Sequence, residues 1–329
     1  MWHGKRHCGQ IPSISPAIRH AHSVCQRHLI TAICDIVVAY ARGFEGEPIT
    51  TVSSISAPYC GWAVLINGNL ASGGRDGVIR IWDTDTGVCV RRLAGHTCIV
   101  LALAVLSDGK LASGSRDGVV CVWDTDTGAC LLTRTVHAYD FNTLCALHNR
   151  MLASGFCDGM VRVLDTDTGA CVLTLRAHIR MVSALAVLSD GKMASGSWDN
   201  TVRVWDIEKG VCIRTLAGHT DAVNALAVLG DDKLASASDD STVRVWDTDK
   251  GACLLTILGH INSVFTLAIL CDRTLASGSH DRTVRVWDTD TGMCLQTLTG
   301  HIDHISTLAA LSDGRLISAD VKGIMMIWK

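Results

Sequence analysis

The sequence predicts an all-β fold, a seven-bladed β-propeller with four antiparallel strands in each blade. Three observations support this fold class. One unit recurs every 41 residues, each unit divides into four short β-prone segments separated by turn residues, and a segment ahead of the repeats can supply a strand that the last unit lacks. An internal repeat decides the architecture before any local propensity does, so it is taken first.

The repeat is most visible in its tryptophans. They fall on one lattice of 41 residues, and the single exception within the lattice is Leu164. A histidine and a serine recur at the same spacing, and no insertion breaks the register between Ser72 and Trp328. Seven units are therefore present. The tryptophans of the lattice are Trp82, Trp123, Trp205, Trp246, Trp287 and Trp328.

Within a unit, turn chemistry separates the strands. Short groups of glycine and aspartate divide apolar and β-branched runs, which is the pattern of hairpins. Four strands repeated radially are typical of a propeller. In the fifth unit the expected strands are residues 222–229, 233–238, 242–246 and 253–257.

Closure of the ring depends on residues 47–52. The last unit ends at Lys329 after three strands, and an open sheet edge would result. One lattice step before the outer strand of the first unit lies the β-prone segment 47–52. We expect this segment to complete the last blade, so that residues 47–329 form the propeller and residues 1–46 an extension.

Composition excludes several classes of partner. The net charge of -3 gives no electrostatic reason to bind nucleic acid or an anionic membrane, and no run of 18 apolar residues predicts a spanning helix. Six of the 15 cysteines recur once per unit, which would place them on separate blades as small buried thiols. We expect no disulfides, a reducing compartment, and hence the cytoplasm or the nucleus. These cysteines are Cys89, Cys130, Cys171, Cys212, Cys253 and Cys294.

Gly-His, an aspartate in the second turn and Trp-Asp recur at fixed spacing, and with these motifs the chain resembles the WD-repeat (WD40-type) family over residues 47–329. The resemblance implies a hydrogen-bonded His, Ser, Asp and Trp tetrad within a blade. Three blades depart from it, with Ile55 for histidine, Leu164 for tryptophan and Lys322 for aspartate, and we expect these blades to be looser. The matching sets are His96, Ser113, Asp117, Trp123; His178, Ser195, Asp199, Trp205; His219, Ser236, Asp240, Trp246; and His260, Ser277, Asp281, Trp287.

Serine, histidine and aspartate together also suggest a hydrolase triad, but a triad needs one activated serine beside an oxyanion hole. Here the trio recurs around the ring, which indicates architecture. The Asp-Thr-Asp-Thr-Gly hairpins lack the ligands of a calcium loop, and no cysteine and histidine spacing is typical of zinc. We expect no enzymatic activity, no cofactor and no metal.

Specificity is expected in the few columns that vary between units. The resemblance implies that these columns lie around the mouth of the central channel, on the face where partners of the family commonly dock. Aromatic side chains and arginine concentrate binding energy, so Trp198 is the leading candidate; the alternative is that Trp198 only covers a loop and Phe265 packs inward. The candidate partner-binding residues are Trp198, Phe265, Tyr139, Arg180, Met181, His280, Arg75 and Arg116.

Residues 1–46 allow several interpretations. They are poor in acidic residues, and an apolar stretch ends at Tyr40, so a transit segment is one alternative. We expect instead a partly disordered extension with a short helix at 23–40. The function we expect is a non-catalytic scaffold for a protein or peptide partner, monomeric within a larger complex. The alternatives are an F-box-like substrate receptor of a ubiquitin ligase and, more remotely, a propeller enzyme.

Overall fold

A computed structural model describes residues 50–53, 61–136, 141–188, 191–230, 232–271 and 273–329. The compact unit that holds the repeats spans Phe44–Lys329. The predicted helix 23–40, and residues 1–46 as a whole, lie outside the described residues.

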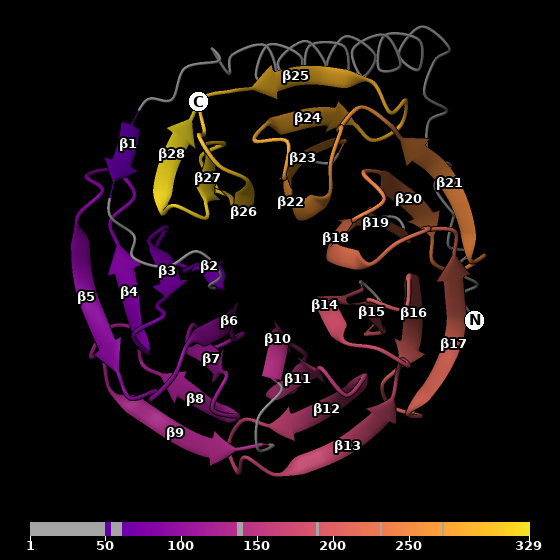
Figure 1. The fold of residues 1–329 in the computed structure, drawn as a ribbon. Coiled ribbons are helices and arrows are strands. Elements are labelled where there is room, and N and C mark those ends of the chain that lie inside the picture. Colours follow the sequence, from indigo (N-terminus) through magenta and orange to yellow (C-terminus); the bar gives the residue numbers. More distant parts are fainter. Residues whose placement is uncertain (1–49, 54–60, 137–140, 189–190, 231, 272) are drawn as a thin grey trace, which may run out of the picture. The chain divides into compact units, whose positions relative to one another are not determined.

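The described residues form seven sheets of four antiparallel strands, and Figure 1 shows them arranged as blades around a central axis. The seven-bladed propeller predicted from the sequence is therefore confirmed. Blades 1 to 3 consist of β2 (Trp62–Val64), β3 (Leu70–Gly73), β4 (Val78–Trp82), β5 (Cys89–Ala94); β6 (Val100–Val105), β7 (Leu111–Ser115), β8 (Val119–Trp123), β9 (Cys130–Thr135); and β10 (Phe141–Ala146), β11 (Met151–Phe156), β12 (Met160–Asp165), β13 (Cys171–Arg176).

Blades 4 to 6 consist of β14 (Val182–Val187), β15 (Met193–Ser197), β16 (Thr201–Asp206), β17 (Val211–Ala217); β18 (Val223–Gly230), β19 (Lys233–Ser238), β20 (Val243–Asp247), β21 (Ala252–Ile257); and β22 (Val264–Cys271), β23 (Thr274–Ser279), β24 (Val284–Asp288), β25 (Cys294–Leu298). Blade 7 has β26 (Ile305–Ala310), β27 (Leu316–Asp320) and β28 (Ile324–Trp328), with β1 (Thr50–Ser53) as its fourth strand. In the fifth blade each strand lies within one residue of the predicted boundaries.

The ring closes through β1. Its backbone pairs antiparallel with β28, with Thr50 opposite Ile327 and Ser53 opposite Ile324. Blade 7 therefore has no open edge at β28, and β2 of blade 1 contacts β26 of blade 7. The closing strand overlaps the predicted segment 47–52, of which residues 47–49 lie outside the described residues.

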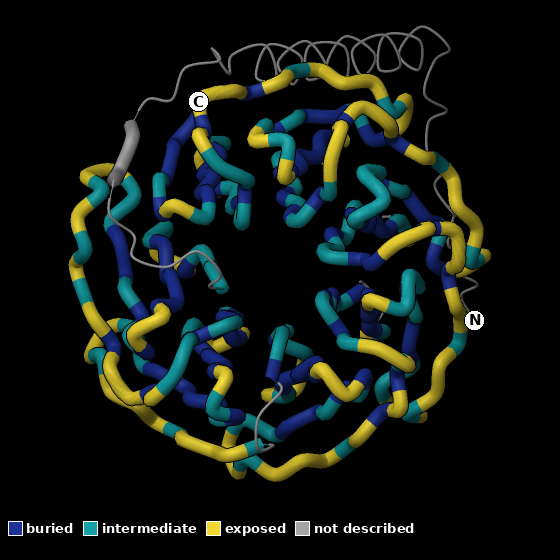
Figure 2. Tube along the Cα trace, viewed as in Figure 1, coloured by how far each residue is buried: buried dark blue, intermediate teal, exposed yellow. Residues whose placement is uncertain are grey.

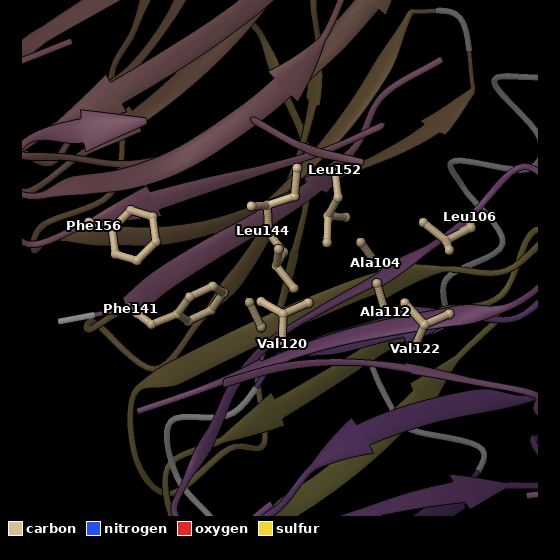
Figure 3. Close-up of a cluster of buried hydrophobic side chains, with 11 residues drawn as sticks. Ala104, Leu106, Ala112, Val120, Val122, Phe141, Leu144, Leu152 and Phe156 are labelled. Carbon is tan, nitrogen blue, oxygen red and sulfur yellow. The ribbon is translucent and has the colours of Figure 1, made fainter. Parts of the chain in front are cut away.

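The core lies between blades. In blades 1 to 6 the two middle strands are buried while the outermost strand is largely exposed, as Figure 2 shows. Between blades 2 and 3, Phe141 and Phe156 pack edge to face with ring centroids 5.7 Å apart (Figure 3). Gly114 makes room for the first ring, since a Cβ there would lie 1.9 Å from it. Large apolar side chains thus fill the junction of the blade in which Leu164 replaces tryptophan.

The expectation of buried cysteines on each blade is wrong. Cys130, Cys171, Cys212, Cys253 and Cys294 are exposed free thiols on the outermost strands, and Cys89 is half-buried. Ala252 and Leu254, on either side of Cys253, are exposed as well, so this part of the outermost strand is open to solvent on both faces. In the described ranges, no helix is long and apolar enough to cross a membrane.

Candidate functional site

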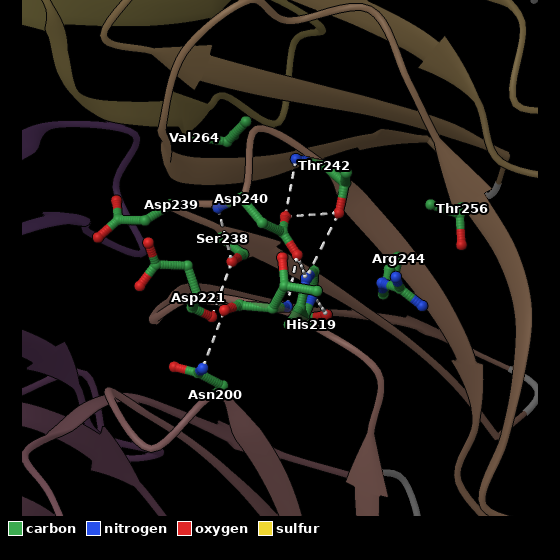
Figure 4. Close-up of polar contacts among 12 residues, drawn as sticks. Asn200, His219, Asp221, Ser238, Asp239, Asp240, Thr242, Arg244, Thr256 and Val264 are labelled. Atoms are coloured by element: carbon green, nitrogen blue, oxygen red, sulfur yellow. Dashed lines mark hydrogen bonds and ion pairs between the residues drawn. The ribbon is translucent and has the colours of Figure 1, made fainter.

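The framework of the site is a chain of buried hydrogen bonds within a blade, and Figure 4 shows the part of it around His219, Asp240 and Thr242 in blade 5. Trp246 Nε1 lies 2.7 Å from Ser236 Oγ, which lies 2.7 Å from His219 Nε2, and His219 Nδ1 lies 2.8 Å from Asp240 Oδ2. Since indole only donates and carboxylate only accepts, His219 carries its proton on Nδ1 and the serine donates to Nε2. The same network joins His178, Ser195, Asp199, Trp205 and His260, Ser277, Asp281, Trp287.

The aspartates of these networks are held ionised. Burial by itself would raise the pKa of Asp240, but hydrogen bonds from His219 and Thr242 outweigh burial and set the pKa well below its usual value. The pKa of Asp281 is lowered in the same way. Burial lowers the pKa of His178, although Asp199 opposes this shift, so the ring stays neutral at pH 7.

Blade 2 differs from the implied tetrad at Asp117. The carboxylate lies 3.9 Å from His96 Nδ1 and instead accepts hydrogen bonds from the amide and hydroxyl of Thr97 at 3.1 and 2.9 Å. In the complete networks a threonine two residues after the aspartate donates its hydroxyl to the carboxylate beside the histidine; blade 2 has Val119 there. The Nδ1 atom of His96 is buried without a hydrogen-bond partner. Ser113 and Trp123 keep their bonds.

Blade 7 corrects the expectation drawn from Lys322. Asp320, two residues earlier, lies 3.0 Å from His301 Nδ1, while Ser318 bonds both His301 at 2.6 Å and Trp328 at 2.7 Å. Asp320 occupies the position that serine holds in blades 4, 5 and 6, and its side chain reaches the same nitrogen from there. Blade 7 therefore has a complete network and is not looser in this respect. Ile55 of blade 1 lies outside the described residues.

The framework holds two variable columns in place. Trp198 directly precedes Asp199, and its amide donates to the carbonyl of Met181 at 3.0 Å. The Asp199 carboxylate also accepts from the amide of Ile179, so the second turn is tied to the connection between blades. The backbone bond recurs as Arg116 to Ile99, Asp239 to Ala222, His280 to Ser263 and Val321 to His304. Side chains in these columns can vary because the backbone beneath them does not depend on their identity.

These columns surround a pocket of about 640 Å³ at the mouth of the channel. The face that carries the pocket is called the channel-mouth face. Trp198 is 46% exposed there, an unusual state for a tryptophan in a structure whose tetrad tryptophans are buried. The lining residues are Leu101, Asn142, Met181, Ser183, Trp198, Asn224, Phe265, His280, His304 and Ser306.

One wall of the pocket is an aromatic cluster. The rings of His280 and His304 lie 4.6 Å apart and nearly perpendicular, and Phe265 contacts both at about 6 Å between centroids. His304 Nδ1 lies 2.9 Å from the carboxylate of Asp303, which fixes the orientation of that ring. The cluster presents a rigid aromatic surface.

The amides and hydroxyls of the pocket have a structural task. Asn142 donates to the carbonyl of Val182 at 2.9 Å, and Asn224 donates to Val264 at 3.2 Å, each time on the following blade. Ser183 makes the same bond to Val223. Three polar members of this column therefore join neighbouring blades, while Ser306 donates to the carbonyl of Ala319 in its own blade. The apolar members, Leu101 and Phe265, are free to contact a ligand.

Four of the eight candidate partner-binding residues line the pocket: Trp198, Phe265, Met181 and His280. Arg180, Arg75 and Arg116 are exposed but do not line it, and Tyr139 lies outside the described residues. Sequence reasoning overlooked His304, although it varies within the same column as Met181. The pocket is consequently less basic and more aromatic than expected.

The geometry also bears on catalysis. Each tetrad serine is buried and accepts the indole proton, so its oxygen faces no substrate; Ser236 is 0% exposed. No cluster of three or more histidine, cysteine, aspartate or glutamate side chains suited to one metal ion occurs in the part of the chain that the structure describes.

Comparison with known families gives one match. The family described as WD domain, G-beta repeat matches six segments, and the segment that contains Leu164 falls between the second and third of them. A comparison with curated proteins gave no match. The matched residues are 42–83, 87–124, 169–206, 210–247, 251–288 and 292–329.

Proposed function

We propose that this chain, which belongs to the WD40 family of G-beta repeats, is a non-catalytic scaffold that binds a protein or peptide at its channel-mouth face. Propellers of this family are typically protein-interaction scaffolds. The observation that carries the proposal is the pocket of about 640 Å³ in which Trp198, Met181 and Phe265 converge. Pockets that combine apolar and aromatic walls with a few polar groups are the usual ligand sites of proteins.

Rigidity supports this assignment. The backbone on both sides of Trp198 is fixed, by the amide bond to Met181 and by the network of Asp199, so little conformational entropy is lost when a ligand contacts the indole. Truncation of an exposed tryptophan in such a position removes binding energy without removing core packing. The ligand that fits is a segment with a large apolar or aromatic side chain, since no lysine, arginine or carboxylate is among the described residues that line the pocket.

Affinity capture with the full chain tests the proposal. The double variant Trp198→Ala, Phe265→Ala is compared with wild type, and Asp126→Ala on the opposite face is the matched control. Partners that bind at the channel mouth are lost from the double variant and kept by the control. Partners retained by the double variant and lost from Asp126→Ala would place binding on the opposite face.

Recruitment of a ubiquitin ligase through residues 1–46 and an intracellular location stay predictions. Deletion of residues 1–46 tests the first: a substrate receptor would lose its ligase components and keep its channel-mouth partner. A simple scaffold would keep the same partners with and without this segment.

A further inference from the structure

On the face opposite the channel mouth, ion pairs in the described part of the chain join neighbouring blades at three junctions. Lys192 lies 3.3 Å from Asp249, Lys233 lies 3.4 Å from Asp290, and Arg315 lies 2.7 Å from Asp85. In each pair the cation stands at the start of the second strand of one blade or directly before it, and the acid lies in the last hairpin of the next. The first two pairs are each separated by 57 residues, so the repeat itself sets the pairing.

The junction of blades 3 and 4 keeps the acid of such a pair and lacks its cation. Met151 stands where the matching blades have lysine, and Glu208, 57 residues later, stands where they have aspartate. A thioether cannot pair with a carboxylate, and no ion pair in the described part of the chain includes Glu208. The nearest cations are engaged elsewhere: Lys209 bonds Asp206 at 2.6 Å. An exposed carboxylate is therefore left without the cation that the fold provides at other junctions.

A second substitution makes the same junction apolar. Five blades have a threonine directly before the hairpin acid, and in blade 5 the hydroxyl of Thr248 donates to the carbonyl of Asp232 at 2.9 Å. Blade 4 has Ile207, which packs with Met151 against the core of the junction. The matching threonines are Thr84, Thr125, Thr166, Thr248 and Thr289.

Together these changes form a pocket of about 450 Å³. Met151, Val163, Val172, Leu173 and Ile207 supply its apolar walls, and Glu208 lies at its edge. Val172 is 54% exposed, so the apolar surface reaches solvent. The pocket belongs to one junction and lies on the face opposite Trp198.

We propose that this pocket is a second binding site, whose ligand is a protein segment with a large aliphatic or aromatic side chain next to lysine or arginine. The apolar side chain fills the space between Met151 and Ile207. The adjacent cation pairs with Glu208 and so takes the place of the lysine that blades 4 and 5 contribute from within the chain. Lys192, Lys233 and Arg315 show, at three other junctions, that a carboxylate in this position pairs with a cation.

Methyl NMR on the full chain labelled at the methionine methyl groups tests the site, because Met151 lines this pocket and Met181 lines the channel mouth. The probes are three blocked hexapeptides whose central pair is leucine and lysine, leucine and glutamine, or leucine and glutamate. The lysine peptide should shift the Met151 signal and bind about threefold more tightly than the glutamine peptide, the effect of one surface ion pair. The glutamate peptide should bind more weakly than both.

Two variants separate the contributions of pocket and charge. Glu208→Gln should abolish the preference for the lysine peptide over the glutamine peptide. Met151→Lys places the residue of other blades in the pocket and should weaken binding, followed by fluorescence anisotropy, at least about tenfold. Lys233→Met, the matched change at the junction of blades 5 and 6, should leave the affinity unchanged.

Two results would overturn the proposal. One is a Met151 signal that does not move with the lysine peptide up to about 10 mM, beyond which affinity is negligible. The other is equal binding of the lysine and glutamate peptides. A shift of Met181 alone would count against this pocket and in favour of the channel mouth, so the two sites are tested independently.

Discussion

Among the carboxylates of blades 2 and 5, that of Asp240 is the one whose removal, by replacement with alanine, should destabilise the propeller most. The carboxylate accepts from His219 Nδ1 at 2.8 Å, from Thr242 Oγ1 at 2.7 Å and from two backbone amides at 3.0 and 3.1 Å. A buried donor left without a partner costs about 1–3 kcal/mol, whereas donors near the surface bond water instead. With His219 buried and the others partly so, the expected loss is about 2–4 kcal/mol.

Asp117→Ala is the informative comparison. Its carboxylate bonds the amide and hydroxyl of Thr97 and the amide of Val119 but lies 3.9 Å from His96, so its removal orphans no buried histidine. The expected loss is about 1 kcal/mol, smaller than for Asp240 by the cost of one buried donor. Asp249→Ala, in an exposed hairpin, should stay within about 0.5 kcal/mol of wild type.

Urea denaturation followed by tryptophan fluorescence measures all three variants, with the midpoint and slope reported separately. The expected order of loss is Asp240, then Asp117, then Asp249. Equal losses for Asp240→Ala and Asp117→Ala would refute the argument that the histidine bond distinguishes the two blades. Equal losses for all three would show that the networks do not stabilise the ring.

Three further predictions concern the ring and its networks. Removal of residues 1–53 should lower the melting temperature well below that of a chain lacking only 1–44, because it removes β1; equal values would contradict closure by this strand. Asp320→Ala should destabilise blade 7 as Asp240→Ala does blade 5, and Lys322→Ala should have little effect. A larger loss of stability for Lys322→Ala would contradict the network in which Asp320 bonds His301. Burial lowers the pKa of His178 below its ordinary 6.5, so stability is full above that pH and declines below it as the unfolded chain takes up protons. The aspartates of blades 5 and 6 have lowered pKa values, so a second decline begins below about 3.8, and a urea midpoint constant from pH 7 to pH 3 would contradict both shifts.

The sequence was sufficient for the fold because one pattern, repeated in register, carries it. The period gave the number of blades, and turn residues gave the strands of blade 5 to within one position. Identical units must pack against one another in the same way, so a pattern read in one blade holds in the others.

Details that depend on side-chain reach could not be read from columns. Asp320 stands two residues before the position at which the repeat places its aspartate. An alignment of the repeats compares positions in the sequence, whereas a hydrogen bond depends on the distance between two atoms, so the network of blade 7 was missed. Asp117 stands at the aspartate position of the repeat, but its carboxylate accepts a hydrogen bond from Thr97. The presence of the residue type therefore predicted the network in blades 4, 5 and 6 and misassigned it in blades 2 and 7.

Burial and pocket geometry raised a similar difficulty. The cysteine of each unit is apolar enough for the interior, but its place on the outermost strand, which is exposed on both faces beside Cys253, leaves it in solvent. Variation within a column pointed to Trp198 and Met181, which do line the pocket. Variation alone could not distinguish Asn142, which joins two blades, from His304, which faces the pocket.

The most direct test of the central claim is the affinity of Trp198→Ala for a partner recovered at the channel mouth, measured by calorimetry beside the urea midpoint of the same variant. Loss of the exposed indole should weaken binding about 30-fold or more, a change of at least about 2 kcal/mol, with an unchanged midpoint. An affinity that is unaffected by Trp198→Ala, but is lost when Asp85, Asp126 and Asp290 of the opposite face are neutralised, would contradict it.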